Sequence, residues 1–201
     1  MLPNQDRSTL KDILSRRSLL TSGDFTLASG EKSSVYVDGK LTTCFSHAMP
    51  LVGRVFIRKI QEQNWSPEAV GGLTVGADPI AFAIARESLN FPPAIDAFIV
   101  RKVAKEHGRH KFIEGLEDPK GRRVVIIDDI CTKGGSTGQA IEKAQEAGMH
   151  IVGVACLVDR QQGATEYLQG KFGFELQSIF TLNELLTHKH EQQLLADPVE
   201  A

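Results

Sequence analysis

The sequence predicts an α/β fold, an open parallel sheet flanked by helices, and three observations support that prediction. From about residue 66 onward, short apolar runs alternate with longer amphipathic stretches, the order expected of strands and crossover helices in a parallel sheet. The run at 124–127 is continuously β-branched, as in a strand that is buried on both faces. Gly148 follows an amphipathic stretch directly, in the position where a helix commonly stops.

The N-terminal part, to about residue 65, has a different pattern. We expect an amphipathic helix at 10–20 and then a short hairpin at 25–40, with Ser29 and Gly30 at its turn. Apolar residues recur at helical spacing further on, which predicts a helix at 46–63. The hairpin and these helices form a small N-terminal subdomain, which we call the hood.

The core of the fold is predicted at about 66–180. Its strands are expected at 69–75, 95–100, 124–127 and 151–158, and its helices at 79–89 and 134–147. Pro79 suits the opening of the first of these helices. One more amphipathic stretch follows residue 181 and leads into a polar end. Because there is no internal repeat and no long linker, we expect residues 1–201 to form one domain, with 181–201 as a C-terminal helix and tail.

Composition and charge exclude several classes of protein. Hydrophobic residues make up 41% of the 201 residues, which is more than a disordered chain contains. The formal charge of −2, from 23 Lys and Arg against 25 Asp and Glu, gives no overall attraction to nucleic acid or acidic membranes. The longest apolar run, 151–158, is far shorter than the roughly 20 residues that span a bilayer. We therefore expect no nucleic-acid partner and no membrane association.

The cysteines and the N-terminus indicate where the protein works. Cys44, Cys131 and Cys156 are widely spaced and contain no Cys-x-x-Cys pair, which argues against a disulfide framework and a thiolate zinc site. The first residues carry charges where a signal peptide needs its apolar stretch. The expected location is the cytoplasm.

The most informative stretch is 124–137, which runs from a buried strand through Asp128 and Asp129 into a loop of small residues and then a helix. In open parallel sheets, ligands bind outside the carboxyl ends of the strands, where this acidic pair falls. The loop residues lie at a helix N-terminus, where free N–H groups and the helix dipole favour a phosphate; they are Gly134, Gly135, Ser136 and Thr137. Two carboxylates beside a phosphate cradle suit a ribose phosphate. The alternative, a polar turn with Asp as helix cap, is less favoured by this combination of residues.

A second polar stretch, 101–111, places seven potentially cationic side chains in eleven positions directly after a strand. A charge run is usually a solvated face. This one contains Gly108, lacks apolar periodicity and lies on the predicted ligand side of the sheet. It therefore predicts a mobile lid whose positive charge meets a polyanion such as diphosphate.

Both stretches resemble known signatures. The first, a hydrophobic strand, two acidic residues and Thr-x-Gly-Gly-Ser, resembles the ribose-phosphate signature of the type I phosphoribosyltransferases. The second, Arg-Lys-x-x-Lys-x-His-Gly followed by Ile-Glu-Gly at 113–115, resembles the catalytic loop of the orotate phosphoribosyltransferases. Stretches at 25–38, 71–80 and 158–160 agree with that family, so the resemblance covers most of the chain.

The resemblance implies a fold, a reaction and a site. The fold is that of the type I phosphoribosyltransferases, and the reaction transfers ribose 5-phosphate from phosphoribosyl diphosphate (PRPP) to orotate. The implied PRPP-binding residues are Arg101, Lys102, Lys105, His107, Asp128, Asp129, Ile130, Cys131, Thr132, Lys133, Gly134, Gly135 and Ser136. The implied orotate-binding residues are Thr132 and Arg160, and the implied catalytic residues are Lys102, Lys105 and Asp129. A guanidinium suits the carboxylate of orotate because it binds in a bidentate manner.

The resemblance also implies a cofactor and an assembly. Mg²⁺ is expected to be held mainly by PRPP, near Asp129, and no side-chain cluster in the sequence forms a metal site of its own. The expected assembly is a homodimer whose basic lid acts in the partner's site. Two other functions stay open: a phosphoribosyltransferase for a purine or uracil, and a PRPP-sensing regulator on the same fold.

Three positions have open interpretations. Many family members have lysine where this chain has Ala28, and Lys32 is a candidate replacement. Asp78 either belongs to the loop that meets PRPP or caps the helix opened by Pro79. Alternating Val35 and Val37 suggest either an interface edge or, more plainly, a strand facing the core.

Overall fold

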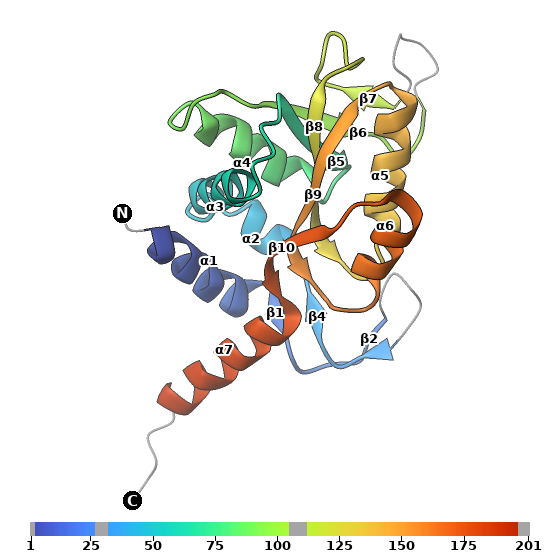
Figure 1. Cartoon of the computed structure of the whole chain (residues 1–201). Helices are drawn as coiled ribbons and strands as arrows, with labels where there is room; N and C mark the ends of the chain where they lie inside the picture. The colour runs from blue at the N-terminus through green and yellow to red at the C-terminus, as the bar shows by residue number, and fades with distance from the viewer. Residues whose placement is uncertain (1–2, 27–31, 105–111, 197–201) are drawn as a thin grey trace, which may run out of the picture.

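The computed structural model describes residues 3–26, 32–104 and 112–196, and a six-stranded sheet runs through its centre (Figure 1). The strand order is β10-β9-β8-β5-β6-β7. The bounds are β5 Ala69–Leu73, β6 Asp96–Val100, β7 Ile113–Glu114, β8 Arg123–Cys131, β9 His150–Asp159 and β10 Leu176–Thr181. Five strands are parallel, as predicted, and β7 pairs antiparallel with β6 at one edge. The predicted α/β class is confirmed, with a mixed rather than purely parallel sheet.

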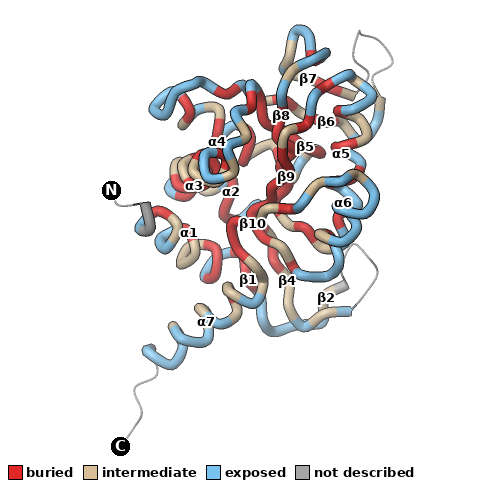
Figure 2. Tube along the Cα trace, viewed as in Figure 1, coloured by how far each residue is buried: buried red, intermediate tan, exposed pale blue. Residues whose placement is uncertain are grey.

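Helices cover both faces of the sheet. They are α3 Met49–Glu62 and α4 Asp78–Ser88 on one face, and α5 Gly135–Glu146 and α6 Ala164–Phe172 on the other. The side chains of β8 alternate between the two layers: Val125 and Ile127 belong to the core under α3 and α4, and Val124 and Ile126 to the core under α5. The prediction that this β-branched strand is buried on both faces is confirmed, and Figure 2 shows the buried centre.

The hood differs in detail from its prediction. Helix α1 spans Pro3–Arg17, so it starts and ends earlier than expected, and Leu19–Leu20 form the short strand β1. Strand β1 pairs with β4, Tyr36–Val37, and this long-range pairing overrides the helical pattern of the sequence. The hairpin consists of β2, Phe25–Thr26, and β3, Lys32–Ser33, and its predicted turn at Ser29 and Gly30 lies outside the described residues.

The hood strand β4 faces the core. Val37 is only 4% exposed and Val35 packs against the same cluster. The interface-edge interpretation of these two valines is therefore wrong, and the core interpretation is confirmed. A short helix that was not predicted, α2 at Lys40–Thr43, follows β4 and brings the chain back toward the sheet.

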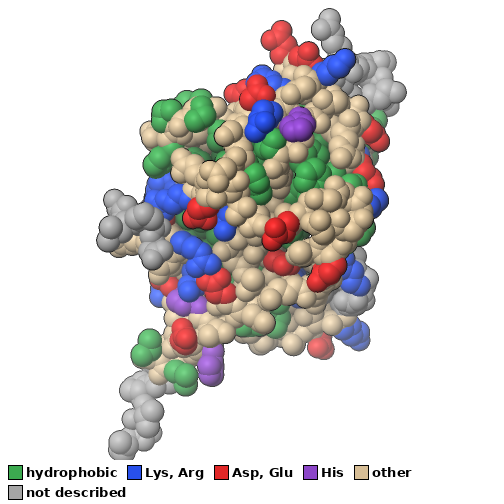
Figure 3. Space-filling model, in the orientation of Figure 1, with side chains coloured by type: hydrophobic (Ala, Val, Ile, Leu, Met, Phe, Trp, Pro, Cys, Tyr) green, Lys and Arg blue, Asp and Glu red, His purple; other side chains and the backbone are tan. Residues whose placement is uncertain are grey.

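The C-terminal part adds elements that the sequence pattern did not predict. Strand β10 extends the sheet beyond β9, and helix α6 connects these two strands. The predicted terminal helix is α7, Leu182–Ala196. On the face shown in Figure 3, positive and negative side chains are interspersed. Ion pairs also join elements far apart in the chain, such as Arg7 of α1 with Glu184 of α7 at 2.8 Å. None of the helices in the described part of the chain is long and apolar enough to cross a membrane.

Candidate active site

The carboxyl ends of four neighbouring strands lie at one edge of the sheet, and the predicted site residues follow them. Asp128 and Asp129 lie within the end of β8, which continues to Cys131 rather than stopping at the predicted position 127. The backbone N–H of Arg160, after β9, donates to the carbonyl oxygen of Cys131 at 2.8 Å. Arg101 directly follows β6, and Gly76 follows β5. The sheet thus brings the acidic pair, Arg160 and the start of the basic stretch to the carboxyl ends of its strands.

Asp128 points toward α5 and is hydrogen bonded within the protein. It is 5% exposed, its Oδ2 accepts a 2.7 Å hydrogen bond from Thr137 Oγ1, and its Oδ1 accepts from the backbone N–H of Asp129 at 3.0 Å. Burial and the neighbouring charge of Asp129 raise the pKa of Asp128 to about 7. In the free protein this carboxyl is therefore partly protonated near neutral pH.

Asp129 lies on the hood side of β8 and keeps one oxygen without a hydrogen bond. It is 8% exposed; Oδ1 accepts from the backbone N–H of Ile130 at 3.0 Å, whereas Oδ2 is buried and accepts no hydrogen bond from the described residues. Two glycines make room for it, because a Cβ at Gly76 would lie 2.4 Å from Oδ1 and one at Gly39 would lie 3.0 Å from Oδ2. A buried carboxylate oxygen with spare capacity is suited to a hydroxyl or a hard cation.

The raised pKa of Asp128 leads to a stability prediction for Asp128→Asn. Because the folded-state pKa lies above the unfolded value of 3.8, folding binds a proton between these values, and stability falls as pH rises from about 4 to 7. Asparagine cannot ionise; its amide oxygen can still accept from the backbone N–H of Asp129, and its amide nitrogen can donate to the hydroxyl oxygen of Thr137. At pH 8 we expect the variant without substrate to melt at least ~2–4 °C above the wild type, which corresponds to about 1 kcal/mol for a chain of this size.

The check is thermal unfolding of both proteins at pH 5 and pH 8. The advantage of the variant should be larger at pH 8, where the wild-type carboxyl must ionise while buried. An equal difference in melting temperature at both pH values would contradict a raised pKa for Asp128.

The predicted phosphate loop lies between β8 and α5. Residues Thr132 and Lys133 lead to Gly134, which has a left-handed backbone, φ 76°, and is the N-cap of α5. Gly135 is open to solvent, and a Cβ there would meet nothing within 4 Å. The first N–H groups of α5 have no partner within the helix, so this loop can receive a phosphate.

Two residues of the predicted PRPP set are part of the scaffold through their side chains. Cys131 is buried, and its Sγ lies 3.1 Å from Thr137 Oγ1, while Ile130 packs against the core under α3 and α4. Cys131 therefore fills space, and neither side chain faces the loop as a polar ligand. Any contact of these two positions with substrate is through the backbone.

Arg160 is a buried cation with unused donors. It is 5% exposed; Nη2 donates to the carbonyl oxygen of Val35 at 3.2 Å, and Nε has no acceptor among the described residues. Burial lowers the pKa of its guanidinium, though the group stays charged. Such a group is expensive to bury unless an anion joins it, so its position favours a carboxylate ligand beside the end of β8.

The basic stretch is described only over its first residues, 101–104. Arg101 pairs with Glu114 at 2.7 Å, and Lys102 is exposed, while Lys105 and His107 lie outside the described residues. The predicted contact of Arg101 with diphosphate therefore requires that its ion pair with Glu114 be exchanged or shared.

Lys40 was not predicted, yet it is the lysine next to the acidic pair. Its Nζ lies 3.6 Å from Asp129 Oδ2 and 3.2 Å from Asp38 Oδ1. Although partial burial opposes it, the charges of Asp129 and Asp38 raise the pKa of Lys40. Lys32, the candidate replacement for the lysine absent at Ala28, is an exposed residue of β3. No local pattern marks Lys40, because only the return of the hood onto β8 places it there.

Asp78 is the first residue of α4, and its side chain bonds back to the loop after β5 rather than capping the helix. Ala77 is the N-cap of α4, and no side chain caps that helix. Asp78 Oδ2 accepts a 2.7 Å hydrogen bond from Thr74 Oγ1, which ties the first residue of α4 to the end of β5. The cap interpretation is therefore wrong; the side chain shapes the loop that contains Gly76, next to Asp129.

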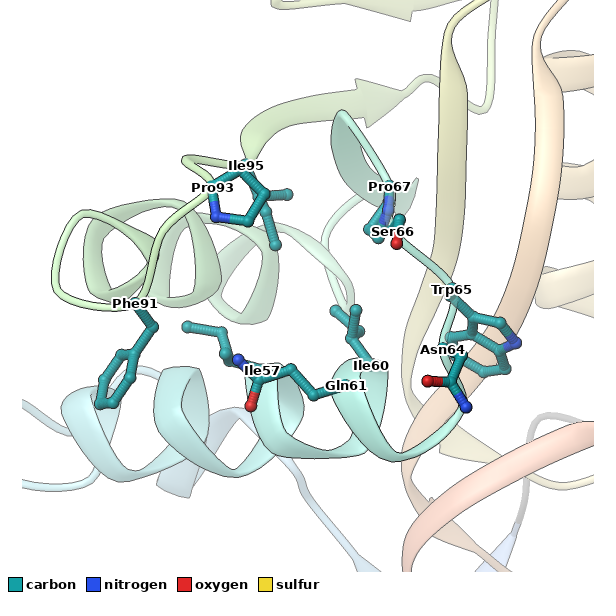
Figure 4. A pocket seen from close by; sticks show the side chains of 10 residues that line it. All are labelled: Ile57, Ile60, Gln61, Asn64, Trp65, Ser66, Pro67, Phe91, Pro93 and Ile95. Atoms are coloured by element: carbon teal, nitrogen blue, oxygen red, sulfur yellow. The ribbon is translucent and has the colours of Figure 1, made fainter.

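A separate cavity of about 230 Å³ lies at the other end of the strands, before β5 and β6 (Figure 4). Its lining is mostly apolar, including Ile57, Ile60, Trp65 and Phe91, and contains no charged side chain. It does not suit a diphosphate. Within residues 3–26, 32–104 and 112–196, no group of three or more His, Cys, Asp or Glu side chains could hold a metal ion.

Comparisons with known proteins show which family the chain resembles. A model of the phosphoribosyl transferase domain matches residues 47–185. The orotate phosphoribosyltransferase of Aquifex aeolicus is 41% identical over 183 residues, which are 90% of this chain and 98% of that protein. That of Mycobacterium leprae is 42% identical over 180 residues, 90% of this chain and 96% of the other.

A solved structure has the same fold. The crystal structure of Mycobacterium tuberculosis orotate phosphoribosyltransferase in complex with 5-phospho-α-D-ribosyl 1-diphosphate has a TM-score of 0.74 and 36% identity, and covers 90% of this chain and 98% of that one. The family model spans most of the sheet and the relatives cover nearly the whole chain. The chain therefore belongs to the orotate phosphoribosyltransferase family.

Proposed function

We propose that this protein transfers ribose 5-phosphate from PRPP to N1 of orotate, giving orotidine 5′-phosphate and diphosphate, a step of pyrimidine nucleotide synthesis. The observation that carries the proposal is that two buried groups lie at adjacent strand ends: the guanidinium of Arg160, whose Nε has no acceptor among the described residues, and the acidic pair Asp128 and Asp129. The guanidinium suits the orotate carboxylate, and the carboxylates suit ribose hydroxyls. Family membership agrees with this assignment.

The acidic pair and the loop bind the phosphorylated ribose in this proposal. Asp129 Oδ2, which lacks a hydrogen bond in the described structure, accepts a ribose hydroxyl, and Asp128 joins it when its proton is released. The 5-phosphate lies on the backbone N–H groups of the loop and the first turn of α5; the residues concerned are Ile130, Cys131, Thr132, Lys133, Gly134, Gly135 and Ser136. Thr132 also reaches the orotate side.

The reaction breaks the bond between the ribose carbon and diphosphate as orotate N1 approaches, so positive charge develops on the ribose and negative charge on the leaving group. We assign Arg101, Lys102, Lys105 and His107 to the diphosphate, with Lys102 and Lys105 neutralising its charge in the transition state. Asp129, which is buried beside the reacting ribose, holds the sugar in place and faces its developing positive charge.

Mg²⁺ fits this site as a partner of PRPP rather than as a resident ion. The donor set includes Asp129 Oδ2, a buried carboxylate oxygen that accepts no hydrogen bond from the described residues, and Mg²⁺ is commonly held by one or two carboxylates plus substrate phosphates. When bound, the ion supplies positive charge to the diphosphate. Lys40, 3.6 Å from the same oxygen, neutralises Asp129 in the described state.

We also propose a cytoplasmic homodimer in which Arg101, Lys105 and His107 act in the partner's site and Lys102 acts in its own. Lys105→Ala and Asp129→Asn homodimers should each be nearly inactive. If the basic stretch acts across the dimer, a mixed dimer has one site with both lesions and one with neither, so activity recovers toward half per heterodimer. Recovery is measured after subunit exchange verified by mass. Confirmed exchange without recovery would show that the basic stretch acts within its own chain.

The function is tested by a spectrophotometric assay of the purified protein with PRPP, Mg²⁺ and orotate, with uracil and the purine bases as alternatives. Loss of orotate absorbance that depends on both PRPP and protein is the expected result. Turnover of another base without turnover of orotate would assign a different substrate. Binding of PRPP with no turnover of any base would favour the PRPP-sensing regulator.

A further inference from the structure

Lys143 is a lysine of α5 to which the proposed reaction gives no role, and it contacts the first end of the basic stretch. Its Nζ donates to the backbone carbonyl oxygen of Arg101 at 2.8 Å and to that of Lys102 at 3.0 Å. One ammonium group thus satisfies two consecutive carbonyls at the point where the chain leaves β6. A solvated surface lysine does not hold two carbonyls of another segment.

The same ammonium also contacts Phe112, the residue directly after the basic stretch. Lys143 Nζ lies 4.3 Å from the centre of the Phe112 ring, within the range of a cation–π interaction. Arg101 and Phe112 are also joined to each other, because the backbone N–H of Arg101 donates to the carbonyl oxygen of Phe112 at 2.8 Å. The ion pair between Arg101 and Glu114 at 2.7 Å adds a second link. Lys143 therefore ties Arg101, Lys102 and Phe112, which are themselves joined, to helix α5.

The helix concerned is the one that carries the phosphate loop. Gly134 caps α5, and Thr137 on its first turn holds Asp128 at 2.7 Å. Through Lys143, Arg101 and Lys102 at the start of the basic stretch and Phe112 directly after it are fixed relative to the phosphate loop and to Asp128. Lys102, a proposed diphosphate ligand, has its own carbonyl held in this way.

We infer that Lys143 is a positioning residue for the transferase reaction. It fastens the start of the basic stretch, and with it Lys102, to α5, so that Lys102 and the loop at the start of α5 bind the diphosphate and the 5-phosphate of one PRPP at a set separation. The inference rests on the proposed function. It implies that loss of Lys143 weakens productive PRPP binding and leaves the orotate side unchanged, since Arg160 lies beyond β8 from this contact.

The test compares Lys143→Met, Lys143→Arg and Lys189→Met with the wild type. Methionine keeps the length and removes the charge and donors, whereas arginine can still donate to two carbonyls and stack on Phe112. Lys189 is the matched control, because it is also a helical lysine that donates to a backbone carbonyl of another segment, that of Leu19 at 2.6 Å. The measurements are kcat, the KM of each substrate, the melting temperature, and tryptic cleavage within 101–112 with and without PRPP and Mg²⁺.

We expect Lys143→Met to raise the PRPP KM or lower kcat so that kcat/KM for PRPP falls ~10-fold or more, with the orotate KM within about twofold. Protection of the 101–112 segment by PRPP should weaken, Lys143→Arg should restore most of both properties, and Lys189→Met should behave as the wild type does. Equal PRPP parameters in Lys143→Met and the wild type would overturn the inference. The inference would also be overturned if Lys189→Met lowered kcat/KM for PRPP as much as Lys143→Met does, with the same change in melting temperature. A wild-type protein without orotate turnover would instead refute the proposed function.

Discussion

Replacing Asp129 with asparagine is expected to lower kcat/KM for PRPP by ~10²-fold or more, while the melting temperature stays within a few degrees of the wild type. The carboxylate is 8% exposed, and its Oδ2 accepts no hydrogen bond in the described structure, so removal of its charge breaks no internal hydrogen bond to that oxygen. The loss appears when the ribose binds, because hydrogen bonds to a charged acceptor contribute about 1.5–3 kcal/mol each.

The experiment varies PRPP at saturating orotate and compares the variant with Asp96→Asn. Asp96 is the first residue of β6, so it lies at the amino ends of the strands, whereas Asp129 lies at their carboxyl ends. The side chain of Asp96 is 60% exposed, so this control makes the same chemical change away from the site. The control should have wild-type kinetics. If Asp129→Asn retains wild-type PRPP parameters as well, the carboxylate has no role in substrate binding and the acidic pair is only part of the scaffold.

Replacing Arg160 with alanine is expected to raise the orotate KM at least ~30-fold, which corresponds to a loss of about 2–4 kcal/mol of binding free energy. The PRPP KM should change much less. The side chain is 5% exposed, and one of its donors, Nε, has no acceptor in the described part of the chain. A carboxylate that binds there both forms strong hydrogen bonds with the guanidinium and neutralises its buried charge.

Two further variants make this prediction specific. Arg160→Lys should restore only part of the affinity, because a lysine cannot form the planar bidentate pair. Arg16→Ala, which removes an exposed arginine of α1, should leave both KM values unchanged. A rise in the PRPP KM at an unchanged orotate KM would assign Arg160 to the other substrate.

Local sequence patterns predicted the parts of the site that are contiguous in the chain. The β-branched run before Asp128 and the double glycine after it predicted a buried strand, an acidic pair and a helix N-terminus, and all three are present. Such features depend on backbone geometry and burial over a few residues, which the sequence expresses directly. The strand boundary was less certain, because pairing with β9 carries β8 through both aspartates to Cys131.

Patterns of charge were less informative. The basic stretch was identified correctly as cationic, yet the pairing of Arg101 with Glu114 and the contacts of Lys143 were not predicted. An antiparallel return at β7 decides both, and a strand of two residues leaves almost no periodic signal. For the same reason, the pairing of β1 with β4 replaced the predicted end of the first helix.

The sequence by itself determined the α/β class, the buried central strand, the acidic pair and the glycine-containing loop before α5, because each depends on neighbours within one turn or one strand. Only the tertiary structure decided which polar groups have partners. It turned Asp128 toward Thr137 on α5 and Asp129 toward Lys40 in the hood, and it buried Arg160 with a free donor. These differences arise because segments far apart in the chain are packed around one end of the sheet. Burial and electrostatic pairing depend on that packing, and no local pattern expresses it.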